Sequence, residues 1–415
     1  MTPESVSRYV VPRQWIRYDA AALLDLLIQA KTAAGVLNRM PYLPQWIEQV
    51  HEEQLRLEAA GTSRIEGAEF TQREQEEALA PDASARSDFT RSQRQLRSAD
   101  ATYRWLRSQS REQPVTPELI LNIHRRIVTG CDDDHCHPGG LRPDGWNVTF
   151  GTPRCRGVEG GRNCRAAFDA LGSAMAREFQ GHDRIIQAMA AHYHIGAMHP
   201  FGDGNGRTAR ALEAFMLRRA GVSNVVMVSL SNYYYDRKHE YLAALSESRR
   251  EGHDLTPFLR FGLQGVAERC NAVAADIVAN HRRTLFREFA RSLFGQLRSP
   301  RRRVLAERQL QILGILLDGG SIAVLDLLNQ SLVHYQGLKF PANALGRDLG
   351  DLFGLGAIDM DDGRIRVNLD WPQQFSESEL LERFENMPSA ASTRHPAMAE
   401  LSRLLARRRG RATLG

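Results

Sequence analysis

The chain has 415 residues, of which 42% are hydrophobic and 25% are charged. This composition is typical of a globular protein with several domains, and it excludes a collagen, a disulfide scaffold and a largely disordered chain. The formal net charge is +5, but residues 403–415 contain five arginines and no acid, which leaves the rest of the chain neutral. The basic pI of about 9.1 therefore reflects a tail and not a domain.

The sequence also indicates a cellular compartment. Five cysteines are too few for the disulfide framework of a secreted protein. Residues 1–15 lack the apolar core of a signal peptide, and no run of about 18 uncharged apolar residues follows. We therefore expect a cytoplasmic protein with no membrane partner.

Helical periodicity dominates the first 300 residues. Thr116 is the expected N-cap of a helix that Pro117 begins. Residues 81–87 form a polar loop, and 129–161 form a long loop with a short strand at 146–150. The expected helices are 20–60 with a break at 38–44, 72–79, 99–108, 117–128, 165–179, 184–198, 207–219, 235–249 and 257–289.

A different pattern follows a predicted linker at 299–303. Helices are expected at 309–317, 324–328 and 343–353, and 357–369 alternates as two strands around a turn at Asp362 and Gly363. Three helices and a hairpin are the element order of a winged-helix domain. The segment from 376 onwards is polar and is expected to form a tail with short helices.

The most informative stretch runs from His199 to Arg210 and reads HPFGDGNGRTAR. Pro200 disfavours helical geometry at His199, so one helix should end there. Three glycines at alternate positions let backbone N–H groups turn inward as an anion-binding nest, and the next helix points its positive end at the same place. Arg207 and Arg210 share one face of that helix. The stretch therefore predicts a polyphosphate site.

Two further residues of this stretch add chemistry. Asp203 is its one carboxylate, and hard oxygen ligands suit Mg²⁺. His199 is its one group that titrates near neutral pH, so it can act as a general base. A nucleotide, a metal and a base together predict phosphoryl or nucleotidyl transfer.

The same stretch resembles the Fic family, whose motif is H-x-F-x-[D/E]-G-N-G-R-x-x-R, at every fixed position. The resemblance covers residues 20–275. Its supporting segments are Pro138 to Arg142, Ala191 to Tyr193, and Leu230, Ser231 and Tyr241. It implies a mainly α fold: a Fic-type helical bundle with a short β-hairpin flap, here joined to a C-terminal winged-helix domain. The expected domains are 1–98 (helical, with an inhibitory helix), 99–285 (catalytic core), 300–375 (winged helix) and 376–415 (tail).

The resemblance implies a protein adenylyltransferase that moves AMP from ATP to a Ser, Thr or Tyr hydroxyl of a target protein and of itself. His199 would be the base, Asp203 would hold Mg²⁺, and Arg207 and Arg210 would hold the β- and γ-phosphates. The anion nest would be lined by Gly202, Gly204, Asn205 and Gly206.

Further roles follow from the same resemblance. Tyr241 would form one wall of the adenine pocket, while the family's second tyrosine is replaced by Leu242. The strand 146–150 would pair with a target segment. Residues 62–67, TSRIEG, match the family's inhibitory pattern through Thr62, Glu66 and Gly67. Glu66 would pair with Arg210 and exclude the γ-phosphate.

Several alternatives stay open. Four cysteines between 131 and 164, with two histidines among them, allow structural zinc, although their spacing favours free thiols. The predicted winged-helix segment has a net charge of −1 over 301–370, which favours a protein-interaction module over DNA binding. UMP or phosphate transfer, a DNA-binding regulator with a nucleotide-sensing domain, and a homodimer are further alternatives.

Overall fold

The computed structural model describes residues 7–80, 88–151, 153–224, 226–228, 230–298 and 300–386. The predicted loop at 81–87 and the tail beyond 386, with its arginines, lie outside these residues. The chain divides into two compact units, Met1–Ile277 and Val278–Gly415, each with its own apolar core. The division falls inside a helix that was expected to end at 289 but reaches Gly295.

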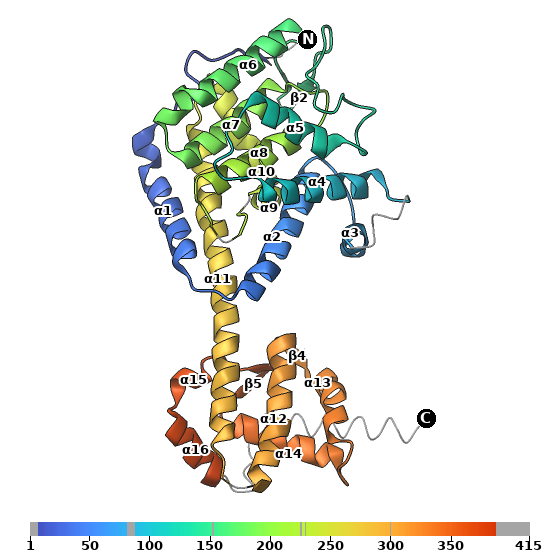
Figure 1. Cartoon of the computed structure of the whole chain (residues 1–415), viewed down its shortest axis with the longest axis vertical. Helices are drawn as coiled ribbons and strands as arrows, with labels where there is room; N and C mark the ends of the chain where they lie inside the picture. Colours follow the sequence, from blue (N-terminus) through green and yellow to red (C-terminus); the bar gives the residue numbers. More distant parts are fainter. Residues whose placement is uncertain are drawn as a thin grey trace. The chain divides into compact units, whose positions relative to one another are not determined.

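The first unit is helical, as predicted (Figure 1). Its most deeply placed helix is α7, where every residue from Ile185 to Met198 except Gly196 is buried. Thr116 caps α5 through the backbone N–H of Leu119, as expected. The helices are α1 (Ala20–Arg39), α2 (Pro44–Ile65), α3 (Gln72–Ala78), α4 (Arg91–Ser108), α5 (Pro117–Val128), α6 (Arg162–Ala176), η2 (Glu178–Gly181), α7 (Arg184–Met198), α8 (Asn205–Arg219), α9 (Ser231–Asp236), α10 (Lys238–Arg250) and α11 (Thr256–Gly295).

Helix α1 is long and apolar enough to cross a membrane by length and composition alone. Within the first unit it buries one face, formed by Leu23, Ala30, Ala33, Ala34 and Leu37. It therefore packs as one helix of the bundle. The break predicted after it is present, because α1 ends at Arg39 and α2 begins at Pro44.

A small sheet lies beside the helices of the first unit. Strand β3 (Cys155–Arg156) pairs antiparallel with β2 (Thr149–Phe150) and parallel with β1 (Ser7–Arg8). The strand predicted at 146–150 is therefore shorter than expected. The N–H of Trp146 bonds to the carbonyl of Pro143 in a turn, so this residue takes no part in the strand ladder.

The second unit contains the end of α11 and the elements that follow it. Its three short strands are antiparallel in the order β4-β6-β5. Asp362 and Gly363 have φ values of 44° and 68°, as a tight hairpin turn requires. The elements are α12 (Pro300–Gly319), β4 (Ile322–Ala323), α13 (Val324–Ser331), η3 (Leu332–Tyr335), α14 (Pro341–Gly354), β5 (Ile358–Asp361), β6 (Arg364–Val367), α15 (Trp371–Gln374) and α16 (Glu377–Asn386).

The predicted linker at 299–303 is wrong from Pro300 onwards, where α12 begins. Proline suits the first helical position, and the arginines that follow are good helix formers, so the charge run is helical. Three helices and then a hairpin agree with the predicted element order, and the winged-helix assignment itself stays a prediction.

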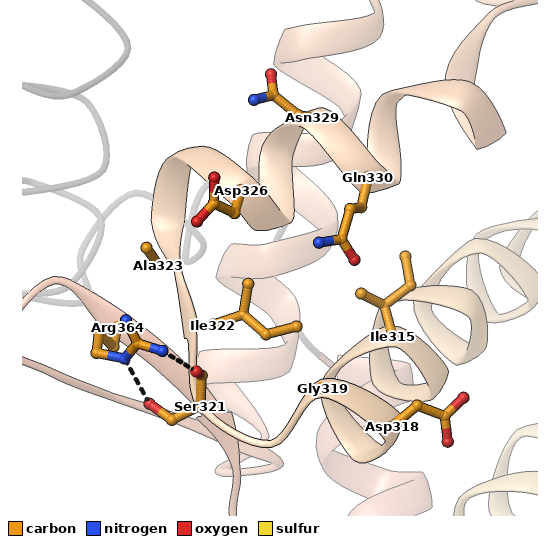
Figure 2. Close-up of a pocket in the computed structure, with 10 residues that line it drawn as sticks. All are labelled: Ile315, Asp318, Gly319, Ser321, Ile322, Ala323, Asp326, Asn329, Gln330 and Arg364. Atoms are coloured by element: carbon orange, nitrogen blue, oxygen red, sulfur yellow. Dashed lines mark hydrogen bonds between the residues drawn. The ribbon is translucent and has the colours of Figure 1, made fainter. Parts of the chain in front are cut away.

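The second unit also contains a pocket of about 590 Å³ between α12, α13 and the hairpin (Figure 2). Arg364 bonds to Ser321 at its edge, and the other polar side chains include Asp318, Asp326, Asn329 and Gln330. Asp318 is 77% exposed, and none of these charged or amide side chains is among the buried residues of the described chain. Because these polar side chains are solvated, they are not held in the fixed orientations that electrostatic catalysis requires.

Candidate active site

The stretch predicted to bind phosphate forms the connection between α7 and α8. His199 ends α7 with a φ of 51°, in the left-handed region, directly before Pro200. Its Nδ1 lies 2.6 Å from the carbonyl oxygen of Gly196. A carbonyl can only accept, so the proton sits on Nδ1 and Nε2 is left with its lone pair free.

The surroundings of His199 keep its ring neutral. The ring stacks on Phe150 of β2, with centroids 3.7 Å apart and planes 9° from parallel. Burial lowers its pKa to about 4, and the bond to Gly196 offsets this only in part. At neutral pH the imidazole can therefore accept a proton.

Two glycines of this stretch are needed for different reasons: Gly204 for its positive φ and Gly206 for the close approach of a side chain. Gly204 has a φ of 74° and caps α8, which begins at Asn205, two residues before the predicted start. Gly206 has ordinary helical geometry, but a Cβ there would lie 2.1 Å from Oε1 of Glu66. The Asn205 side chain bonds both to the N–H and to the carbonyl of Phe201, at 2.9 and 3.0 Å, and closes the loop. Gly202 lies against the carbonyl of His135 and the ring of Trp146.

Arg210 is buried on α8 and meets the last turn of α2. Its Nη2 lies 2.6 Å from Oε1 of Glu66, and its Nε donates to Oγ1 of Thr62 at 2.9 Å. Gly67, with a φ of 93°, follows the end of α2. Burial alone would raise the pKa of Glu66, but the charge and the hydrogen bond of Arg210 outweigh it, and the pKa is lowered. Glu66 is therefore ionised at neutral pH.

Arg207 also has a carboxylate partner, one that the sequence did not reveal. Its Nη1 lies 2.6 Å from Oδ2 of Asp132, whose side chain is fully buried just after α5. Arg91 bonds to the same carboxylate at 2.5 Å and reaches Asp203 at 3.5 Å. Burial opposes ionisation of Asp132, but Arg207 and Arg91 overcome it and lower the pKa to about 2. The sequence shows three consecutive acids at 132–134, but it does not indicate which of them is buried.

Asp203 is suitably placed for a cation. Its carboxylate is 33% exposed, accepts from the N–H of Gly204 at 2.5 Å and lies 3.5 Å from Arg207. Mg²⁺ needs only one or two carboxylates when substrate phosphates and water complete its shell. The residues therefore fit Mg²⁺ bound together with a polyphosphate.

The cysteines were the candidate ligands for a structural zinc ion. All five cysteines are free and buried. Over the residues that the structure describes, no three His, Cys, Asp or Glu side chains gather in a way that could hold a metal. The zinc alternative therefore has no ligand set in this part of the chain.

A pocket of about 270 Å³ is lined by some of the predicted residues, whereas Gly202, Asp203, Gly204, Asn205 and Arg207 do not line it. His199, Glu66, Arg210, Tyr241 and Leu242 were expected at the site and line it. The sequence did not single out Phe150 as the partner of the His199 ring, nor Arg249, whose guanidinium lies 5.5 Å from the centroid of the Phe150 ring.

Arg142 is a further residue whose role the sequence did not reveal. It is buried and donates from Nε to the carbonyl of His199 at 2.7 Å and from its other nitrogens to the carbonyls of Trp146 and Val158. It thereby ties the loop that leads to β2 to the end of α7, and positions Phe150 beside His199.

Comparison with known proteins gives a family match for the segment that contains this stretch. Residues 114–217 match the model of the Fic/DOC family, and this segment includes the whole of the HPFGDGNGRTAR stretch. The chain thus contains a Fic/DOC domain and is distantly related to protein adenylyltransferases.

Two curated relatives illustrate the distance. The chain is 38% identical over 155 residues to Protein adenylyltransferase Fic of Nematostella vectensis, which covers 36% of this chain and 32% of the relative. It is 39% identical over 77 residues to Protein adenylyltransferase Fic of Aedes aegypti, which covers 19% and 14%. The chain thus spans a third or less of the length of these relatives.

Two solved structures share the fold. Fic-1 (residues 134–508) from C. elegans has a TM-score of 0.51 at 22% identity, over 63% of this chain and 74% of that one. A Fic family protein from Desulfovibrio desulfuricans G20 has a TM-score of 0.50 at 18% identity, over 88% and 98%. These likenesses confirm a mainly helical, Fic-like fold.

Proposed function

We propose that the chain is a protein adenylyltransferase that transfers AMP from ATP to a hydroxyl group of a target protein and of itself. The observation that carries this proposal is the neutral His199, with Nε2 free, beside two arginines at the N-terminal end of α8. A base and a phosphate-binding helix end are the two parts that in-line attack on a nucleotide needs.

In the proposed reaction, the Nε2 atom of His199 takes the proton from a Ser, Thr or Tyr hydroxyl. The hydroxyl oxygen forms a bond to the α-phosphorus of ATP, and the bond from that phosphorus to the bridging oxygen breaks as pyrophosphate leaves. Arg207 and Arg210 bind the β- and γ-phosphates, and backbone N–H groups from Gly202 to Gly206 line the nest. Mg²⁺, held by Asp203, would neutralise phosphate charge.

The site as described is restrained. Glu66 occupies Arg210 with an ion pair of 2.6 Å and places negative charge where the γ-phosphate would bind. A like charge at close range costs several kcal/mol (roughly 4 kcal/mol for unit charges at 4 Å and an effective dielectric constant of about 20), so ATP would bind in an unreactive pose. We propose that removal or movement of Glu66 activates transfer.

Two features would select the substrates. Tyr241 and Leu242 line the pocket and would contact adenine. Strand β2, with Phe150 stacked on His199, would pair with an extended target segment and bring its hydroxyl to Nε2. The predicted winged-helix segment, which has a net charge of −1 over 301–370, is proposed to dock a protein rather than DNA.

The test is autolabelling of the full chain. Glu66→Gly, incubated with ATP and Mg²⁺, should gain the mass of AMP, and Glu66→Gly with His199→Ala should gain none. Glu69→Gly is a matched control, because Glu69 is an exposed carboxylate in the loop just after α2. A gain of phosphate, or of UMP when UTP is supplied, would replace the proposal, and absence of any label in Glu66→Gly would overturn it.

A further inference from the structure

A chain of buried polar groups leads away from Arg210 into the core. The Nη1 atom of Arg210 lies 3.4 Å from the hydroxyl of Tyr241. That hydroxyl lies 2.9 Å from Nε2 of His192, and Nδ1 of His192 lies 3.0 Å from Oε2 of Glu213. The other oxygen of Glu213 accepts from the hydroxyl of Tyr234 at 2.9 Å.

The chain of contacts has a defined direction. Oε2 of Glu213 lies beside Nδ1 of His192 without the alignment of a hydrogen bond, and its negative charge favours a proton on that nitrogen, which leaves Nε2 as an acceptor. The Tyr241 hydroxyl then donates to Nε2, and its oxygen lone pairs are turned towards Arg210. Burial raises the pKa of Tyr241 to about 12, so the hydroxyl keeps its proton at neutral pH.

These groups form a chain of contacts across three helices of the first unit. Arg210 and Glu213 lie on α8, Tyr241 on α10 and His192 on α7. All four are at most 3% exposed. Their exchange of partners with water is therefore limited, and a buried network of this kind holds its members in one geometry.

This chain of contacts is separate from the contacts that Arg210 makes with the end of α2. The other hydrogen bonds of Arg210 go to the side chain and carbonyl of Thr62 and to Glu66, all of which belong to the end of α2. If this end of α2 moves away, those contacts leave together. The contact with Tyr241 then remains from the bundle itself.

We propose that Glu213, His192 and the Tyr241 hydroxyl are positioning residues that hold Arg210 in place for the γ-phosphate once Glu66 is withdrawn. This inference rests on the proposed function, since it assigns a structural support to the arginine that would bind the γ-phosphate. The inference assigns a role to the hydroxyl of Tyr241 in addition to the contact of its aromatic ring with adenine. A contact with adenine would be common to ATP and ADP, whereas support of Arg210 matters only for the nucleotide with a γ-phosphate.

The experiment compares the affinities for ATP and ADP by isothermal titration calorimetry with Mg²⁺. The parent is the full chain with Glu66→Gly and His199→Ala, which opens the site and prevents turnover. Tyr241→Phe keeps the ring that stacks on Tyr234 and removes only the hydroxyl. It should weaken ATP binding by about fivefold, the effect of one buried hydrogen bond, and change ADP binding by less than about twofold. Glu213→Gln should shift the same ratio in the same direction.

The control is Tyr233→Phe, which removes a buried hydroxyl that donates to the carbonyl of Phe261 at 3.3 Å and has no contact with Arg210. It should leave the ratio of ATP to ADP affinity unchanged. Equal weakening of both nucleotides by Tyr241→Phe, or no weakening of either, would overturn the inference alone. Failure of the parent to bind ATP would overturn both the inference and the proposed function.

Discussion

The two arginines of α8 that are proposed to bind phosphate are restrained in different ways. Arg210 pairs with Glu66, whose side chain is 33% exposed at the end of α2. Arg207 pairs with Asp132, whose side chain is fully buried and which also bonds to Arg91 and Gln95. The first carboxylate can be solvated when it leaves, and the second cannot without opening the core. We infer that the pair with Glu66 is a switch and that the pair with Asp132 is part of the framework.

The largest effect is expected from breaking the framework pair. Asp132→Asn removes the nearer and fully buried counter-charge of Arg207 and leaves only Asp203 at 3.5 Å, which should cost about 3–5 kcal/mol of unfolding free energy. Urea unfolding followed by circular dichroism measures it. Asp134→Asn, at an acid that is 77% exposed, is the control and should be nearly neutral. A loss for Asp132→Asn no greater than that of the control would remove the distinction between the two pairs.

The next effect concerns activity. Glu66→Gly should raise autoadenylylation by at least about tenfold, because it frees Arg210, while Asp132→Asn should lower it by misplacing Arg207. Initial rates of label uptake from ATP, at equal folded concentration, measure both. A higher rate for Glu66→Gly together with a lower rate for Asp132→Asn would support the assignment of the Glu66 pair as a switch and of the Asp132 pair as part of the framework. A rise in both variants would mean that Asp132 is a second inhibitory group.

A smaller effect is expected on the pKa of His199, which should respond to a change at Glu66 but not to one at Asp132. Burial lowers the pKa of His199 to about 4, and the negative charge of Glu66 opposes part of this lowering. Asp132 is not among the main influences on this pKa. Glu66→Gln should therefore lower this pKa further, and Asp132→Asn should leave it unchanged. The group is neutral above its pKa and becomes charged as the pH falls through it. NMR titration of labelled histidines, assigned with His199→Ala, measures the shift, and a value near 6.5 would contradict the buried geometry.

The smallest effect is expected at Arg91, which bridges Asp132 and Asp203 but is 48% exposed. Water screens this pair, so Arg91→Ala should cost less than about 1 kcal/mol of unfolding free energy. The same urea measurement applies, and added salt should reduce the difference from wild type. A loss as large as that of Asp132→Asn would show that the exposed arginine, and not Arg207, is the main partner of Asp132.

Local chemistry made much of the fold predictable. Thr116 and Pro117 start a helix because an N-cap oxygen and a fixed φ act within one turn, and Asp362 and Gly363 form a hairpin turn for similarly local reasons. Two failures have tertiary causes. Trp146 was expected in a strand, but its backbone is bound by Pro143 and Arg142. Residues 300–303 read as a linker, but they begin a helix that packs on the core of the second unit through residues such as Leu313 and Leu316.

The sequence by itself determined which residues of the loop and of the start of α8 make up the candidate site, because HPFGDGNGRTAR is contiguous and its glycines, arginines and histidine lie on one loop and one helix end. The tertiary structure alone decided which distant groups meet the two arginines. Asp132 could not be told from Asp133 or Asp134, and the chain of contacts through Tyr241, His192 and Glu213 joins three helices. Ion pairs and hydrogen bonds over such separations depend on packing, and no local pattern in the chain encodes them.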